Sequence, residues 1–170
     1  MKVEEYWDIY DENRNKTNRL HKRVVPLSGG DYHIVVEIWT VNINRQILLT
    51  KRHPDKPWGN FWECTGGSVV AGEDSITGAK RELLEETGID ALKDNLIQIG
   101  SLQSGNNFYD TYLIKKNIAI QDLTLQAEEV IDAKWVTMQE FTKMCSDEII
   151  APPILSRFNL YQNKILEFFA

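Results

Sequence analysis

The stretch Gly67–Ile89 reads GSVVAGEDSITGAKRELLEETGI and decides most of what can be said about this chain. It fits the spaced pattern G-x5-E-x7-R-E-U-x-E-E-x-G-U, where U is aliphatic, at every specified position. Each fixed residue has a background frequency of about 5–7%, so a match of this length by chance is negligible. The segment is therefore expected to have one defined structure and one defined chemistry.

The second half of this segment has the spacing of a helix that carries three acids on one side. Side chains three and four positions apart share a helix face, so Glu82, Glu85 and Glu86 project within an arc of about 100°. A neighbouring apolar stripe predicts that the helix packs on a sheet. The stripe consists of Ile76, Ala79 and Leu83. The acids then lie at the edge of the buried face and point into a cleft.

Left alone, this arrangement of acids is unfavourable. Like charges at these spacings each cost a few tenths of a kcal/mol. Glu85 and Glu86 also lie at the negative end of the helix dipole, just before the expected cap Gly88. A bound divalent cation offsets both penalties, and carboxylate oxygens suit Mg2+ or Mn2+. An isolated E-x-x-E-E is usually a solvated helix face, but Arg81 and the glycines around the segment favour a metal site here.

The segment is identified as a Nudix box, and the chain resembles the Nudix superfamily. The resemblance implies Mg2+-dependent hydrolysis of a diphosphate linked to another group. It also implies an α+β fold, an α/β/α sandwich with a mixed sheet. The implied metal ligands are Glu82, Glu85, Glu86 and the backbone carbonyl of Gly67. Glu73 is expected to support the loop before the helix.

Composition fits one small enzyme domain over residues 1–170. The chain is 42% hydrophobic and 26% charged, which is adequate for one core. A net charge of −6 without basic runs argues against a nucleic-acid polymer as partner. No apolar run is long enough to span a membrane, and no secretory signal is seen. Cys64 and Cys145 are too few for a disulfide framework, which predicts reduced thiols and a cytoplasmic location. The protein is expected to be a monomer or a homodimer.

Strand and helix patterns surround the box on both sides. An N-terminal hairpin is expected from residues 7–10 and 19–25, and a second one from 33–41 and 46–51. The other strands are expected at 61–65, 95–103, 110–116 and 133–136. Helices are expected at 138–145 and from Pro152 onward, where two prolines can open a helix.

The first half of the chain also resembles the isopentenyl-diphosphate isomerase-like branch of Nudix proteins. The resemblance rests on residues 7–13, His33 and residues 48–52. The isomerases of that branch need a cysteine and a metal-binding histidine just before the box, and those positions fall on Gly66 and Ser68. Cys64 is two residues early, which displaces its side chain by about 6–7 Å along a strand. Hydrolysis is therefore favoured over isomerisation.

Further site residues are expected in the loops around the helix. Glu129 resembles the acid that many Nudix enzymes place opposite the box, where it serves as metal ligand or general base. Arg52 and Lys56 are expected beside the cleft as phosphate ligands. Phe108 is a candidate for contact with substrate, and Trp58, Phe61 and Tyr109 share that chemistry. His33 is expected to be a hydrogen-bonded strand residue.

These features predict a diphosphohydrolase that acts on a nucleoside-diphosphate-type small molecule. Glu82, Glu85, Glu86 and Glu129 are the expected catalytic residues. The alternatives are a prenyl-diphosphate hydrolase or isomerase-like enzyme and, in a different class, a ligand-sensing module without catalysis. Such a module tolerates losses in the acidic triad, and none is lost here.

Overall fold

The computed structural model describes residues 4–92 and 95–169, and a mixed sheet of seven strands is its centre. Strand β3 (His33–Val41) lies in the middle of this sheet and is buried at all but one of its positions. It pairs in parallel with β8 (Asn107–Lys115) and antiparallel with β4 (Gln46–Arg52) and β6 (Thr65–Ser68). The remaining strands are β5 (Trp62–Glu63), β7 (Ile97–Ser104) and β9 (Val130–Thr137).

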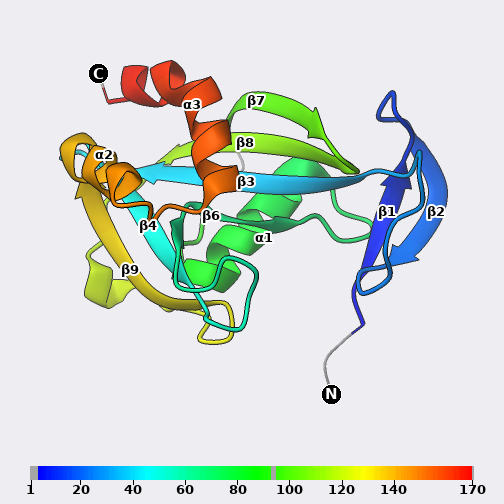
Figure 1. Cartoon of the computed structure of the whole chain (residues 1–170), viewed down its shortest axis with the longest axis horizontal. Helices are drawn as coiled ribbons and strands as arrows, with labels where there is room; N and C mark the ends of the chain where they lie inside the picture. Colours follow the sequence, from blue (N-terminus) through cyan, green and yellow to red (C-terminus); the bar gives the residue numbers. More distant parts are fainter. Residues whose placement is uncertain (1–3, 93–94, 170) are drawn as a thin grey trace.

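Helices cover both faces of the sheet and form a sandwich (Figure 1). Helix α1 (Ser75–Thr87) packs Ala79 and Leu83 against one face, together with Val36 and Ile38 of β3. Helices α2 (Met138–Ser146) and α3 (Pro152–Glu167) pack on the other face. Because side chains alternate along a strand, β3 supplies both cores. The predicted α+β sandwich is confirmed.

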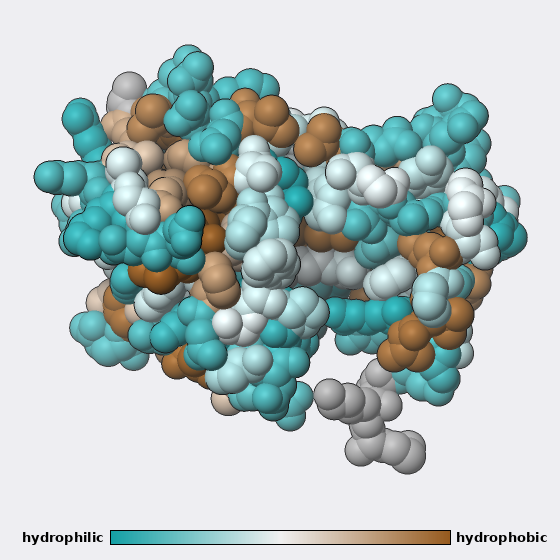
Figure 2. Space-filling view, viewed as in Figure 1, coloured by the Kyte–Doolittle hydropathy of each residue, from teal (hydrophilic) through white to brown (hydrophobic). Residues whose placement is uncertain are grey.

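The expected N-terminal hairpin lies at one end of the molecule as a separate two-stranded sheet (Figure 1). It consists of β1 (Tyr6–Tyr10) and β2 (Lys16–Lys22). The Asp11 carboxylate closes the turn by accepting the backbone N–H groups of Asn13 and Asn15 at 2.9 and 2.8 Å. Figure 2 shows the molecular surface hollowed between this hairpin and the main body.

Most predicted elements are present, with shifted ends. β2 runs over 16–22 instead of 19–25, because Lys16 already pairs with Tyr10 of β1 and Val24 lies exposed in the turn that follows. The strand expected at 61–65 is two short strands, β5 and β6. β8 begins at Asn107 and not at 110, since Gly105 at φ 57° allows a tight turn. In the described part of the chain, no helix has the length and apolar character needed to cross a membrane.

Candidate active site

Helix α1 begins and ends where its sequence predicts. The Asp74 side chain caps the first turn by accepting the backbone N–H of Thr77 at 2.9 Å. Gly88 ends the helix in the left-handed conformation at φ 74°, and its N–H bonds to the carbonyl of Leu84. The helix thereby presents its acidic residues beside β6, the short strand that crosses its buried side.

The three box carboxylates have different surroundings. Glu82 and Glu86 are buried, whereas the Glu85 side chain is 47% exposed. Arg81 links the group, since its guanidinium donates to Glu73 at 2.8 Å, Glu82 at 2.9 Å and Glu85 at 3.1 Å. Burial raises the pKa of Glu82, and the charge of Arg81 opposes that shift. The acids are thus gathered on one face, as the spacing predicts.

Glu73 belongs to the loop that precedes the helix. Its Oε2 accepts the backbone N–H of Val70 at 3.2 Å and a bond from Arg81 at 3.1 Å. Arg81 in turn donates to the carbonyl of Ser68 at 2.9 Å. These bonds hold the loop against the helix, which is the supporting role expected for Glu73.

Glu86 is a buried acid with little compensation. Its one hydrogen bond among the described residues comes from the Gly66 N–H at a distance of 3.4 Å. Burial raises the pKa of Glu86 well above its usual value, and the charges of Glu63 and Glu82 add to the shift. An uncompensated buried carboxylate is costly, so this position favours a cation as partner.

Gly67 borders the same acids, and a side chain at this position would displace the Glu82 carboxylate. A Cβ atom at Gly67 would lie 2.3 Å from the Glu82 carboxyl carbon. The donor set around it, made of carboxylate oxygens and a backbone carbonyl, is the kind that Mg2+ and Mn2+ prefer. Among the described residues, no three His, Cys, Asp or Glu side chains already converge as metal ligands.

A cleft of about 190 Å³ opens on the other side of Gly66 and Gly67. Arg52 lines it and bonds to Glu63 at 2.6 Å and to the Pro57 carbonyl at 2.7 Å. Burial raises the pKa of Glu63 to about 7, against the effect of Arg52. The half-exposed Trp58 also lines the cleft. The remaining lining residues are Val35, Val36, Glu37, Cys64, Ala151, Pro153, Ile154 and Arg157.

Lys56 and Glu129 form an ion pair outside this cleft. They line the hollow between the body and the hairpin. Lys22 and Arg23 of the hairpin line the same hollow. Glu129 is close enough for its charge to raise the pKa of Glu86, and Arg23 lowers that of Glu82. Lys22 and Arg23 are paired there with Glu4 and Glu5, so the hairpin places two ion pairs beside the box, which the sequence did not indicate.

The structure corrects the placement of Phe108. The prediction made it a substrate contact, but its side chain is 5% exposed and packs in the core beneath α1. Tyr32 contacts its ring and the Arg14 guanidinium lies 5.3 Å from the ring centre. Phe108 is on β8 and does not line the cleft, so it is a core residue.

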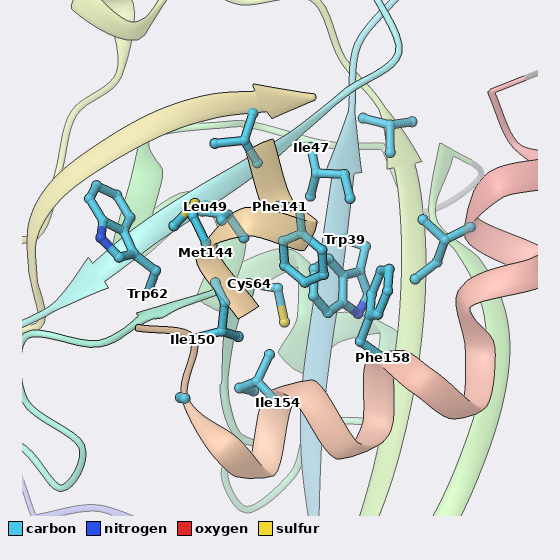
Figure 3. Packing of buried hydrophobic residues seen from close by; sticks show 14 of the residues in the cluster. Trp39, Ile47, Leu49, Trp62, Cys64, Phe141, Met144, Ile150, Ile154 and Phe158 are labelled. Atoms are coloured by element: carbon cyan, nitrogen blue, oxygen red, sulfur yellow. The ribbon is translucent and has the colours of Figure 1, made fainter. Parts of the chain in front are cut away.

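Cys64 and His33 are also buried. Cys64 is 1% exposed and packs among Trp39, Ile154 and Phe158 (Figure 3). Burial raises the pKa of its thiol well above the usual value, so the unreactive thiol dominates. His33 stacks on Trp7 with ring centres 3.7 Å apart, and its Nδ1 has no hydrogen-bond partner within the described residues. The expectation of a hydrogen-bonded strand residue is confirmed, because His33 lies in β3 and shares a side-chain hydrogen bond with Asn107.

Two charged residues of the cleft were missed from the sequence. Glu37 lies in the middle of β3 and pairs with Arg157 of α3. The signal was present as a lone acid within the apolar run 33–41. Its partner is 120 positions away, and sequence spacing does not bring the two together.

Known proteins are similar to this chain in sequence and in fold. The family model described as NUDIX domain matches residues 31–158. An uncharacterised Nudix hydrolase of Listeria monocytogenes is 36% identical over 168 residues, covering 96% of this chain and 99% of the relative.

Two solved structures share the fold at low sequence identity. A Deinococcus radiodurans protein has a TM-score of 0.71 at 19% identity, covering 86% of this chain and 92% of its own. A Francisella tularensis bifunctional NMN adenylyltransferase/ADP ribose pyrophosphatase, complexed with AMP and a Mn ion, has a TM-score of 0.64 at 17% identity. The match covers 83% of this chain and 43% of that protein.

Proposed function

Because this chain belongs to the Nudix hydrolase family, whose members act on pyrophosphate bonds, we propose that it cleaves the diphosphate linkage of a nucleoside-diphosphate-type small molecule. The observation that carries this proposal is the pair of buried carboxylates, Glu82 and Glu86, gathered behind Gly67. We place the enzyme in the cytoplasm, in line with its two free cysteines. We propose that it is a monomer or a homodimer.

The residues for a divalent cation are Glu82, Glu85, Glu86 and the Gly67 carbonyl. When bound there, Mg2+ or Mn2+ would neutralise the charge of the phosphate groups and polarise the phosphorus centre. The half-exposed Glu85 leaves its end of the site open to substrate, while the two buried acids hold the inner end. Arg81 keeps the acids in place through its shared hydrogen bonds.

The chain's own groups complete the hydrolysis. A water molecule attacks phosphorus in line, its proton passes to Glu129 or to a box glutamate, and the bridging P–O bond breaks. The fragment that leaves carries the bridging oxygen. Lys56 holds Glu129 in the present structure, and both groups face the hollow beside the box. Lys56 and Arg52 are the two side chains proposed to bind phosphate, and Arg52 lines the cleft.

Two other functions are less well supported. Isomerase chemistry requires a thiol within reach of substrate, and here its expected position is Gly66 while Cys64 packs in the core. Ser68 stands where that chemistry needs an imidazole. A prenyl-diphosphate hydrolase retains the same metal face, so the substrate is the point of difference. A non-catalytic module has no use for the complete box.

A panel of nucleoside diphosphates, nucleotide sugars, dinucleotides and prenyl diphosphates tests the proposal. Each compound is incubated with Mg2+, Mn2+ or EDTA, and the products are separated and quantified. We expect metal-dependent cleavage of a nucleotide compound that EDTA abolishes. Cleavage limited to prenyl diphosphates would replace the nucleotide assignment, and no cleavage of any compound would favour the sensing module.

A further inference from the structure

Glu37 is a buried acid with one unused oxygen. The residue is 2% exposed, and its Oε1 accepts a hydrogen bond from the Nε atom of Arg157 at 2.5 Å and forms an ion pair with the Nη2 atom. Its Oε2 is also buried, and it has no hydrogen-bond partner in the described part of the chain. A buried acceptor without a donor costs free energy, so its retention calls for a donor that arrives from elsewhere.

The cleft gives such a donor a way in. Glu37 and Arg157 both line it, and Gly66 and Gly67 form its border toward the box acids. The two glycines have no side chains, so a ligand can approach their backbone closely. Glu37 is the cross-strand partner of Gly66, so a molecule in the cleft that approaches these glycines also passes beside Glu37.

The other surfaces of the cleft suit a flat ring. The half-exposed Trp58 lines one part of it, and Ala151, Pro153 and Ile154 line another. A cavity of about 150 Å³ holds a benzene ring, so the 190 Å³ here accommodates one aromatic ring. Aromatic surface beside a carboxylate acceptor is complementary to a heterocycle that carries N–H donors.

We propose that this cleft is a base-recognition subsite in which Glu37 Oε2 accepts a hydrogen bond from the exocyclic amino group of a nucleobase. The inference rests on the proposed function for the link to a diphosphate. Arg157 holds the carboxylate in place, and its guanidinium is itself fixed over the Tyr109 ring at 4.1 Å. Cytosine, adenine and guanine carry such an amino group, and cytosine and adenine have matched carbonyl counterparts in uracil and hypoxanthine.

The same geometry disfavours the competing ligands. A prenyl chain has no donor, so it would fill the cleft and leave Oε2 buried and unpaired. Uracil and hypoxanthine carry a carbonyl oxygen where cytosine and adenine carry the amine. That oxygen would face the carboxylate, and two acceptors repel each other.

Metal-free binding of monophosphates isolates this recognition from hydrolysis. Calorimetry with CMP against UMP, and with AMP against IMP, compares molecules that differ at the amino or carbonyl position. One of the two pairs should bind more tightly than the other. Within that pair, we expect the Kd of the amino compound to be at least about tenfold lower than that of the carbonyl compound. A ratio below twofold in both pairs, or no binding by any of the four, overturns the proposal.

The Glu37→Gln variant tests the residue itself, with Glu12→Gln as an exposed control. The amide offers an N–H to a carbonyl base, so we expect the preference to disappear or reverse, whereas the control keeps it. An unchanged preference in a folded Glu37→Gln variant overturns the assignment to Glu37. If the Glu37→Gln variant does not fold, the CMP/UMP and AMP/IMP affinity ratios of the wild-type protein decide whether the proposal stands.

The two proposals fail separately in these experiments. A base preference without hydrolysis of any diphosphate leaves the subsite standing and removes the proposed activity. Nucleotide hydrolysis with equal binding of amino and carbonyl bases does the reverse.

Discussion

Arg14, in the turn of the N-terminal hairpin, forms a two-pronged ion pair with Asp110 of β8, 96 positions away in the chain. Asp110 is fully buried, and it also accepts hydrogen bonds from Ser101, at 2.8 Å, and from Ser75. Ser75 is the first residue of α1. The hairpin is thereby connected to the start of the box helix through one carboxylate.

Replacing Arg14 should destabilise the whole fold. Arg14→Met leaves Asp110 buried without its cation, and we expect the free energy of unfolding to fall by about 3 kcal/mol. Arg23→Met is the matched control, because the Arg23–Glu5 pair of the same hairpin is exposed on both sides and such pairs contribute about 0–1 kcal/mol. Urea denaturation measures both, and equal losses would show that the hairpin connection is not special.

Gly67 should be essential to the site and dispensable for folding. A Cβ atom there meets the Glu82 carboxylate, a movable side chain, so Gly67→Ala should displace that acid and leave the backbone intact. We expect turnover to fall by at least about tenfold with little change in melting temperature. Gly29→Ala is the control, since nothing lies within 4 Å of its added Cβ. Full activity of Gly67→Ala would remove Glu82 from the site.

His33 should make stability depend on pH. Burial lowers its pKa from 6.5 to about 4, with smaller contributions of the same sign from Arg23 and His21, opposed by Asn107. The unfolded chain therefore binds a proton near pH 6.5, and the folded chain does so only near pH 4. Stability from this group is complete above pH 6.5 and falls by up to about 3 kcal/mol toward pH 4.

The variant His33→Phe keeps the stack on Trp7 and removes the titration. Its unfolding free energy should change less between pH 7.5 and 4.5 than that of the wild type. Parallel curves for the two proteins would show that His33 does not titrate as its burial indicates.

Cys64 should have no role in chemistry. Its side chain packs in the core (Figure 3), so Cys64→Ala should leave diphosphate hydrolysis within about threefold of wild type. We also expect no conversion of isopentenyl diphosphate to its allylic isomer with Mg2+ or Zn2+. Isomer formation by the wild type that is lost in Cys64→Ala would reinstate the isomerase.

The sequence predicted those parts of the site that are local. The box helix, its cap at Gly88 and the shared face of Glu82 and Glu86 follow from spacing within one helix. The assignments that fail depend on tertiary packing. Phe108 has the right chemistry for a ligand, but its place on β8 turns it into the core. The Glu37–Arg157 pair joins a strand to a helix 120 positions later, which periodicity cannot reveal.

The box glutamates also separate activity from stability. Glu86 is buried with one weak hydrogen bond and three acids near it, so Glu86→Gln should preserve or raise the unfolding free energy. Glu85→Gln loses an exposed pair with Arg81, worth about 0–1 kcal/mol. A loss of several kcal/mol in either variant would mean that these acids serve the fold.

Turnover of the best nucleotide substrate by Glu85→Gln and Glu86→Gln, measured across a Mg2+ titration, tests the central claim most directly. Each substitution keeps the shape of the side chain and removes a charge that the cation needs. We predict that each variant loses at least about 10^2-fold in kcat at saturating Mg2+ while remaining folded. Wild-type turnover with an unchanged Mg2+ dependence in both variants would contradict the assignment of these glutamates as the metal-binding catalytic residues.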